Sequence, residues 1–115
     1  MLALKRAYAP SSSQDGQRLL VDRLWPRGIS KESLKIAHWY RDVAPSAELR
    51  EWFGHDPARW NEFKKRYFAE LEKMPQTWQP ILDSAQKGKT TLIYGARDTE
   101  HNDAVALKEF LEARM

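Results

Sequence analysis

Two closely spaced arginines are the first residues in this chain whose type and position suggest chemistry. Arg23 and Arg27 flank Trp25 within the segment Val21–Gly28, directly after an apolar run. A guanidinium is always charged, and its planar fork of N–H donors matches phosphate and carboxylate groups. The segment therefore predicts an anion-binding site made by Arg23 and Arg27, with Trp25 placed to stack on the ligand and Gly28 at its end.

The same residues have a structural alternative. Arg23 could form an internal ion pair with Asp22 or Asp42, and Trp25 could simply close the end of the core. The sequence leaves both interpretations open.

A second part of the predicted site is the segment Gly95–Asn102. Its small first residues permit close approach of a ligand, and the exposed N–H groups at the start of a following helix attract negative charge. Arg97, His101 and Asn102 would add hydrogen-bond donors. No P-loop motif is present, and an ordinary capped turn is the alternative explanation of this segment.

Proton transfer, if the protein is an enzyme, needs carboxylates or imidazoles near that site. The acid–base candidates all follow or flank predicted strands and helices, and they are Asp22, Asp42, His55, Asp98 and His101. Asp56, beside His55, is explained more simply as a helix cap.

Ser46 is a further ligand-binding candidate, because its hydroxyl stands at the start of a predicted helix, where anions are attracted. Helix capping alone also explains this serine. Without a G-x-S-x-G motif or an evident base beside Ser46, the sequence argues against a hydrolase triad.

Alternating short apolar runs and amphipathic segments must position these residues. Four strands are predicted from β-branched and apolar runs that end at Pro, Gly or charged residues: Leu2–Tyr8, Arg18–Arg23, Ile36–Val43 and Thr90–Gly95. Helices are predicted from caps and apolar periodicity: Ser46–Gly54, Asp56–Met74, Thr77–Gly88 with Pro80 in its first turn, and a last helix starting between Thr99 and Asn102.

Strands separated by helices predict a small α/β fold of two or three layers, with a largely parallel sheet of about four strands and flanking helices. Ligands of such folds collect at the C-terminal edge of the sheet. Both predicted parts of the site follow strands, so we expect them to meet at that edge.

The composition limits the number of domains and the kinds of chemistry that the chain can support. The 115 residues predict one domain spanning residues 1–115, and the absence of cysteine excludes disulfides and thiolate chemistry. The three histidines are widely separated, so no metal site and no cofactor are expected. No stretch is apolar enough to span a bilayer or act as a signal peptide, which predicts a cytoplasmic protein without membrane contact.

Several segments together resemble the YeaO-like branch of the family called domain of unknown function 488. The resemblance is carried, in chain order, by Leu20–Gly28, Asp42–Ser46, Glu48–Arg50, Trp52–Asp56, Phe63, Arg66–Tyr67, Glu70–Leu71 and Leu92–Asp98. It implies a small α/β fold with a largely parallel sheet, and it implies no activity. Longer members of the family carry a cysteine-containing loop after the last strand, where this chain has Tyr94 and Asn102. Thiol chemistry therefore does not transfer.

Three functions remain open at this point. The first is an enzyme or binding protein for a phosphorylated or carboxylated metabolite, or a nucleotide, held by Arg23, Arg27 and Arg97. The second is a nucleic-acid-binding module, suggested by the net charge of +3 and by the Arg23–Trp25–Arg27 pattern. The third is a protein-interaction domain without a small ligand.

Overall fold

The computed structural model describes all 115 residues. Four strands and five helices follow one another along the chain: β1 Leu2–Arg6, β2 Gln17–Leu20, α1 Lys31–Leu34, β3 His38–Trp39, α2 Ala47–Phe53, α3 Trp60–Glu72, α4 Pro75–Lys87, β4 Thr90–Tyr94 and α5 Asp103–Glu112. Short 3-10 turns are formed by Ser13–Asp15, Arg41–Val43 and Pro57–Arg59.

The four strands form one sheet in the order β1-β4-β2-β3, and every pairing is parallel. Strand β4 is fully buried and lies between β1 and β2, so that Leu92 is paired with Leu4 on one side and Leu19 on the other. A parallel strand buried on both faces needs a continuous apolar run, which Thr90–Tyr94 supplies. The predicted α/β fold with a parallel sheet is confirmed.

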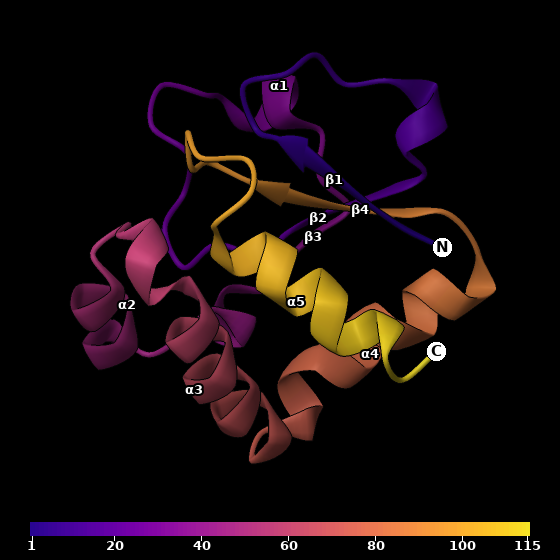
Figure 1. Ribbon diagram of the computed structural model, residues 1–115. Coiled ribbons are helices and arrows are strands. Elements are labelled where there is room, and N and C mark those ends of the chain that lie inside the picture. The colour runs from indigo at the N-terminus through magenta and orange to yellow at the C-terminus, as the bar shows by residue number, and fades with distance from the viewer.

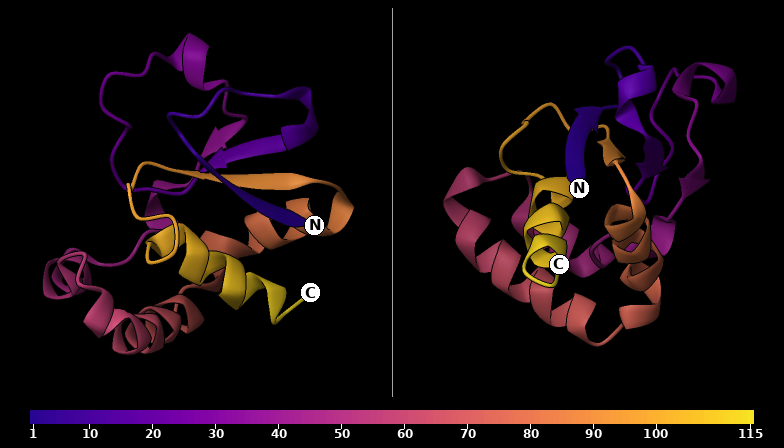
Figure 2. Two further views of the ribbon diagram at one scale, coloured as in Figure 1. Left: turned by 45° about the horizontal axis from the view of Figure 1, so that its top comes forward. Right: turned by 90° about the vertical axis from the view of Figure 1, so that its right-hand side faces the viewer.

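Side chains on the two faces of the sheet enter different cores. Leu19 and Leu92 join the large core against α3, α4 and α5, whereas Leu20 and Ile93 join a smaller cluster with Leu34 of α1. This alternation follows from the two-residue period of a strand. Figure 1 shows the longer helices below the sheet and α1 above it, and the two views of Figure 2 show the same layering.

Local signals explain most of the helices. The Ser46 hydroxyl accepts the Leu49 N–H to cap α2, and Gly54 ends that helix with φ 54°. In α3 the side chains of Phe63, Tyr67 and Leu71 are spaced by one turn and all are buried.

All four strands end earlier in the structure than predicted, β1 at Arg6 rather than Tyr8 and β4 at Tyr94 rather than Gly95. Strand β2 ends at Leu20 rather than Arg23, and β3 comprises only His38–Trp39 because the chain turns into the 3-10 helix Arg41–Val43. Strand β3 is an edge strand with a single neighbour, so no second partner holds the apolar residues after it in extended form.

Two helix predictions also need correction. Helix α4 begins at Pro75, not Thr77, so Pro80 lies inside the helix and not in its first turn. Pro80 is exposed, and water can therefore satisfy the carbonyl group that a proline leaves unbonded. Helix α1 was not expected; Ser30 caps it through the Ser33 N–H. None of the helices combines the length and apolar character required to cross a bilayer.

Candidate ligand-binding cleft

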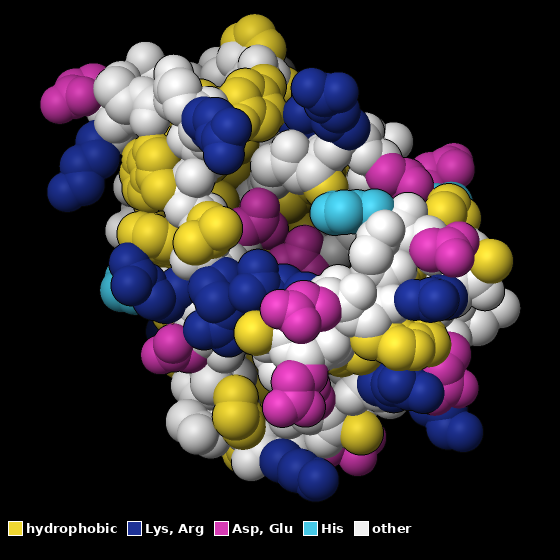
Figure 3. Space-filling model, turned by 90° about the vertical axis from the view of Figure 1, so that its left-hand side faces the viewer, with side chains coloured by type: hydrophobic (Ala, Val, Ile, Leu, Met, Phe, Trp, Pro, Cys, Tyr) yellow, Lys and Arg dark blue, Asp and Glu magenta, His cyan; other side chains and the backbone are white.

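A cleft of about 540 Å³ opens where β2 and β4 end, between the segments that follow these strands, helix α2 and the start of α5. Figure 3 shows this side of the molecule, with acidic side chains deep in a hollow, a group of Lys and Arg side chains beside them and a histidine on the rim. The lining residues are Asp22, Arg23, Leu24, Arg27, Pro45, Arg50, Phe53, His55, Phe63, Gly95, Ala96, Asn102 and Asp103.

Asp22 joins the two strand ends at the base of the cleft. Its Oδ2 accepts a hydrogen bond of 2.8 Å from the Gly95 N–H. A Cβ at residue 95 would lie 3.4 Å from that oxygen, so glycine leaves the carboxyl room to approach. The Trp39 indole N–H donates to the Asp22 carbonyl oxygen at 2.7 Å and holds the backbone of this residue from the other side.

The Asp22 carboxyl has a second acid as its neighbour. It lies beside the Asp103 carboxyl, on the first residue of α5, and both carboxyls line the cleft. Burial raises the pKa of Asp22, while the Gly95 N–H and the Arg50 charge act in the opposite direction. Burial and the adjacent Asp22 raise the pKa of Asp103 well above its ordinary value. Two neighbouring carboxyls oppose each other's ionisation, in the same direction as burial.

Tyr67 lies beneath this pair and is fully buried. Its hydroxyl donates to the Val43 carbonyl oxygen at 2.6 Å. Burial, together with the negative charges of Asp103 and Glu70, raises the pKa of Tyr67 well above its ordinary value. The phenol is therefore neutral, and it lies in the core behind the cleft rather than in its lining.

Three arginines line the cleft without forming ion pairs. Neither Arg23, Arg27 nor Arg50 has a carboxylate oxygen within 4.0 Å. The Nε of Arg23 is fully buried and has no hydrogen-bond acceptor. Its Nη2 makes only a long bond of 3.4 Å to the Ala44 carbonyl oxygen. The internal ion pairs considered for Arg23 with Asp22 or Asp42 are not formed.

The structure brings five of the sequence candidates to this cleft: Asp22, Arg23, Arg27, His55 and Asn102. Arg27 and His55 are exposed at its edge. Asn102 is buried and caps α5, with Oδ1 accepting the Val105 N–H and Nδ2 donating to the Asp98 carbonyl oxygen. Its amide is thus already bonded on both sides.

Two candidates from the last loop pair with each other. The Nδ1 of His101 lies 3.0 Å from Asp98 Oδ2, and Asp98 also accepts the backbone N–H groups of Glu100 and His101. The Glu100 N–H is the largest influence that lowers the pKa of Asp98. Neither side chain lines the cleft, and together they organise the turn before α5.

The remaining candidates lie outside the lining. Trp25 donates its indole N–H to the Ile29 carbonyl oxygen at 2.6 Å and packs edge-on against Trp39, so its ring belongs to the smaller core. The Ser46 hydroxyl accepts the Leu49 N–H and donates to Glu70 Oε2 at 2.5 Å, so it is already bonded. The last three, Gly28, Asp42 and Arg97, are exposed away from the cleft.

Sequence reasoning missed Arg50 and Asp103. Arg50 lies in α2 at a position that the sequence pattern assigns to ordinary solvated surface. Its spacing in the sequence does not indicate that it lies near Arg23. Asp103 follows the N-cap of α5, where an acidic residue has a sufficient explanation in the helix dipole. Only the packing of α5 against β1 and β4 shows that this carboxyl reaches the cleft beside Asp22.

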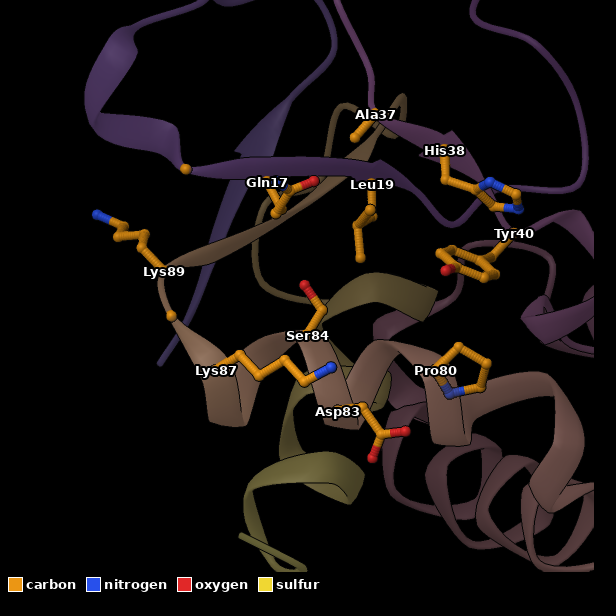
Figure 4. Close-up of a pocket in the computed structure, with 12 residues that line it drawn as sticks. Gln17, Leu19, Ala37, His38, Tyr40, Pro80, Asp83, Ser84, Lys87 and Lys89 are labelled. Carbon is orange, nitrogen blue, oxygen red and sulfur yellow. The ribbon is translucent and has the colours of Figure 1, made fainter.

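A second, more open groove of about 720 Å³ lies at the other end of β2, between this strand, the start of β3 and helix α4. Figure 4 shows Ser84 on α4 pointing toward Gln17 and Leu19 on β2, with His38 and Tyr40 at one side. The ring centroids of His38 and Tyr40 lie 4.2 Å apart with the rings tilted by 43°, and the Ser84 hydroxyl is bonded to the Thr90 hydroxyl. No buried polar atom lacks a partner there, so the first cleft is the stronger candidate.

Comparison with known proteins places the chain in a family. A family model described as the inactive DUF488-N3 subclade matches residues 1–115. The chain belongs to the DUF488 family. Within it, the chain is similar to uncharacterized protein YeaO of Escherichia coli K12, with 40% identity over 109 residues that cover 95% of each chain.

A second similar protein comes from Mycobacterium tuberculosis. Uncharacterized protein Rv3073c of Mycobacterium tuberculosis H37Rv is 38% identical over 109 residues, which cover 95% of this chain and 92% of the relative. No solved structure has significant similarity to the chain. The expected resemblance to the YeaO-like DUF488 proteins is thereby confirmed.

Proposed function

We propose that this DUF488 protein binds a small metabolite through a phosphate or carboxylate group, which Arg23, Arg27 and Arg50 hold in the cleft. The observation that carries this proposal is the pairing of charges. Acids and arginines line the same cleft, yet the acids lie beside each other and the arginines have no carboxylate partner.

This arrangement is costly without a ligand. A buried N–H donor that lacks an acceptor costs about 1–3 kcal/mol relative to its bonded state. An anion that accepts from the Arg23 guanidinium would recover that free energy with a charge-assisted hydrogen bond. The cleft also falls within the usual range of small-molecule sites, roughly 300–1,000 Å³.

Binding without covalent chemistry agrees best with the lining. No serine, threonine, lysine or tyrosine lines the cleft, so it offers no hydroxyl or amine nucleophile. The matched family model is described as an inactive subclade, which favours the same interpretation.

The test is a titration of the isotope-labelled protein with inorganic phosphate, followed by NMR. We expect the Gly95 and Arg23 amide signals to shift, and Arg23→Ala or Arg50→Ala to weaken binding about tenfold or more each, since one charge-assisted bond contributes roughly 1.5–3 kcal/mol. Arg97→Ala is the matched control, because it removes an exposed arginine near the same sheet edge but outside the lining.

Two outcomes contradict the proposal. Equal weakening by all three substitutions would indicate a general effect of net charge. Absence of phosphate binding, together with salt-sensitive binding of an oligonucleotide, would favour the nucleic-acid module instead.

A further inference from the structure

Apolar side chains share the lining of the cleft with the arginines. Leu24, the residue after Arg23, is 70% exposed, which is the largest exposed fraction among the large apolar side chains of the chain. Single exposed leucines are common on protein surfaces. Leu24 differs because it lines the same cleft as four further apolar residues, which are Pro45, Phe53, Phe63 and Ala96. The cleft therefore offers a ligand an apolar surface next to its charged groups.

Two phenylalanines form a firm apolar wall of the cleft. Phe53 ends α2 and Phe63 lies on α3, and their rings stack with centroids 4.4 Å apart and planes inclined by 27°. Both belong to the large core and are at most 5% exposed. This wall is thus fixed by packing, and Leu24 is the apolar side chain that a ligand can remove from water.

Polar partners for hydroxyl groups are scarce in the same lining. The Asn102 amide is bonded on both sides, and Asp22 Oδ2 already accepts the Gly95 N–H. The lining contains no serine, threonine, lysine or tyrosine. A hydroxyl group that is buried without a partner is unfavourable, so the cleft is poorly suited to a sugar or another polyol.

Resting on the proposed function, we infer that the ligand carries an apolar group of about the size of a six-membered ring on its phosphate or carboxylate. The arginines hold the anion, and Leu24 and the phenylalanine wall contact the apolar group. The volume agrees with this assignment, because an apolar cavity of about 150 Å³ holds a benzene ring and the cleft measures about 540 Å³. Binding forms and breaks no covalent bond.

Phenyl phosphate and glycerol phosphate test the inference directly. Both are phosphate monoesters of similar size and equal charge at pH 8, but glycerol phosphate carries hydroxyl groups in place of the apolar ring. We expect phenyl phosphate to bind at least about tenfold more tightly, because covering apolar surface favours binding. In NMR titrations the Leu24 methyl signals should shift with phenyl phosphate and much less with inorganic phosphate.

Leu24→Ser tests whether the preference arises at this residue. We expect this substitution to reduce the ratio of the two affinities by about threefold or more, because part of the apolar contact is lost. Leu24→Met should keep the ratio. Met115→Ser is the matched control, because it removes an exposed apolar side chain outside the lining. Since the ratio is measured within one variant, any change in stability or in phosphate affinity affects both probes alike.

The results distinguish this inference from the proposed function. Equal affinities for phenyl phosphate and glycerol phosphate, with inorganic phosphate still bound, would overturn the apolar preference and leave the anion site intact. A preference that Leu24→Ser leaves unchanged, or that Met115→Ser reduces equally, would overturn the assignment of the apolar contact to Leu24. No binding of any of the three phosphate compounds would overturn the anion site itself.

Discussion

Two charged regions stand at opposite ends of strand β2, and they differ in how completely their charges are paired. Before the strand, Asp15 accepts hydrogen bonds from Lys5 at 2.8 Å and from Arg18, which lies in the strand, at 2.7 Å. The Nε and Nη2 of Arg18 both donate to the Leu34 carbonyl oxygen. After the strand, Asp22 and Asp103 lie beside each other, and the Arg23 Nε has no acceptor.

The charged side chains at the start of β2 are bonded within the protein, whereas some of those in the cleft are not. Arg18 is 5% exposed and Asp15 is 6% exposed, so their network is sealed and ties β2 to α1. The charges of the cleft face an open volume and leave donors unmatched. A buried charge that is fully bonded supports the fold, whereas a charge without its partner indicates a place for a ligand.

The largest effect is expected from breaking the sealed region. Arg18→Ala leaves the Asp15 carboxylate buried with only Lys5, and we expect it to lower the free energy of unfolding by about 3–5 kcal/mol. Urea denaturation measures this. Arg59→Ala is the control, since it removes an arginine from an exposed ion pair with Asp56 and should change stability by less than about 1 kcal/mol.

Acid should weaken the same region. The Lys5 hydrogen bond is the main influence that lowers the pKa of Asp15 to about 2. An acid whose pKa is depressed in the folded state contributes stability above its unfolded value near 4, and that contribution is lost as the pH falls through about 2. A pH series of thermal melts should show this loss between pH 4 and 2 in the unaltered protein, and a smaller loss in Lys5→Met.

An intermediate effect is expected at Ser46, which bridges α2 and α3. Ser46→Ala removes the N-cap of α2 and the bond to Glu70, so it should lower stability by about 1–2 kcal/mol. Phosphate affinity should stay unchanged. A loss of phosphate affinity without a loss of stability would instead indicate that Ser46 takes part in phosphate binding.

A stabilising change of about 1 kcal/mol is expected at Asp103. Burial raises the pKa of Asp103, so the folded state holds a proton that the unfolded state releases near pH 4, and stability falls as the pH rises above this value. Asp103→Asn removes that penalty and should raise stability at pH 7 but not at pH 3. Equal gains at both pH values would show that ionisation is not the cause.

The smallest effect on stability is expected at Arg23. Arg23→Ala should change the free energy of unfolding by less than about 1 kcal/mol, because its guanidinium is poorly bonded in the unliganded cleft. Calorimetric melting of this variant beside Arg18→Ala compares the two regions directly. Similar destabilisation by both substitutions would remove the distinction between them.

Local sequence signals determined the parallel α/β fold and one half of the cleft. The apolar run Thr90–Tyr94 specified the central strand, and caps such as Ser46 and Asn102 specified where helices begin. The strand before Asp22 and Arg23 located these residues at the C-terminal edge of the sheet. These features depend on neighbours in the chain, which periodicity and capping describe well.

The tertiary structure alone decided which charges meet. Arg50 and Asp103 lie far from Arg23 in the sequence and carry no local mark of function, yet packing brings α2 and α5 to the end of β2. The same packing directed Trp25 into the smaller core and left Arg97 outside the cleft. Ion pairing depends on distances between separate elements, and a residue's type and spacing do not contain them.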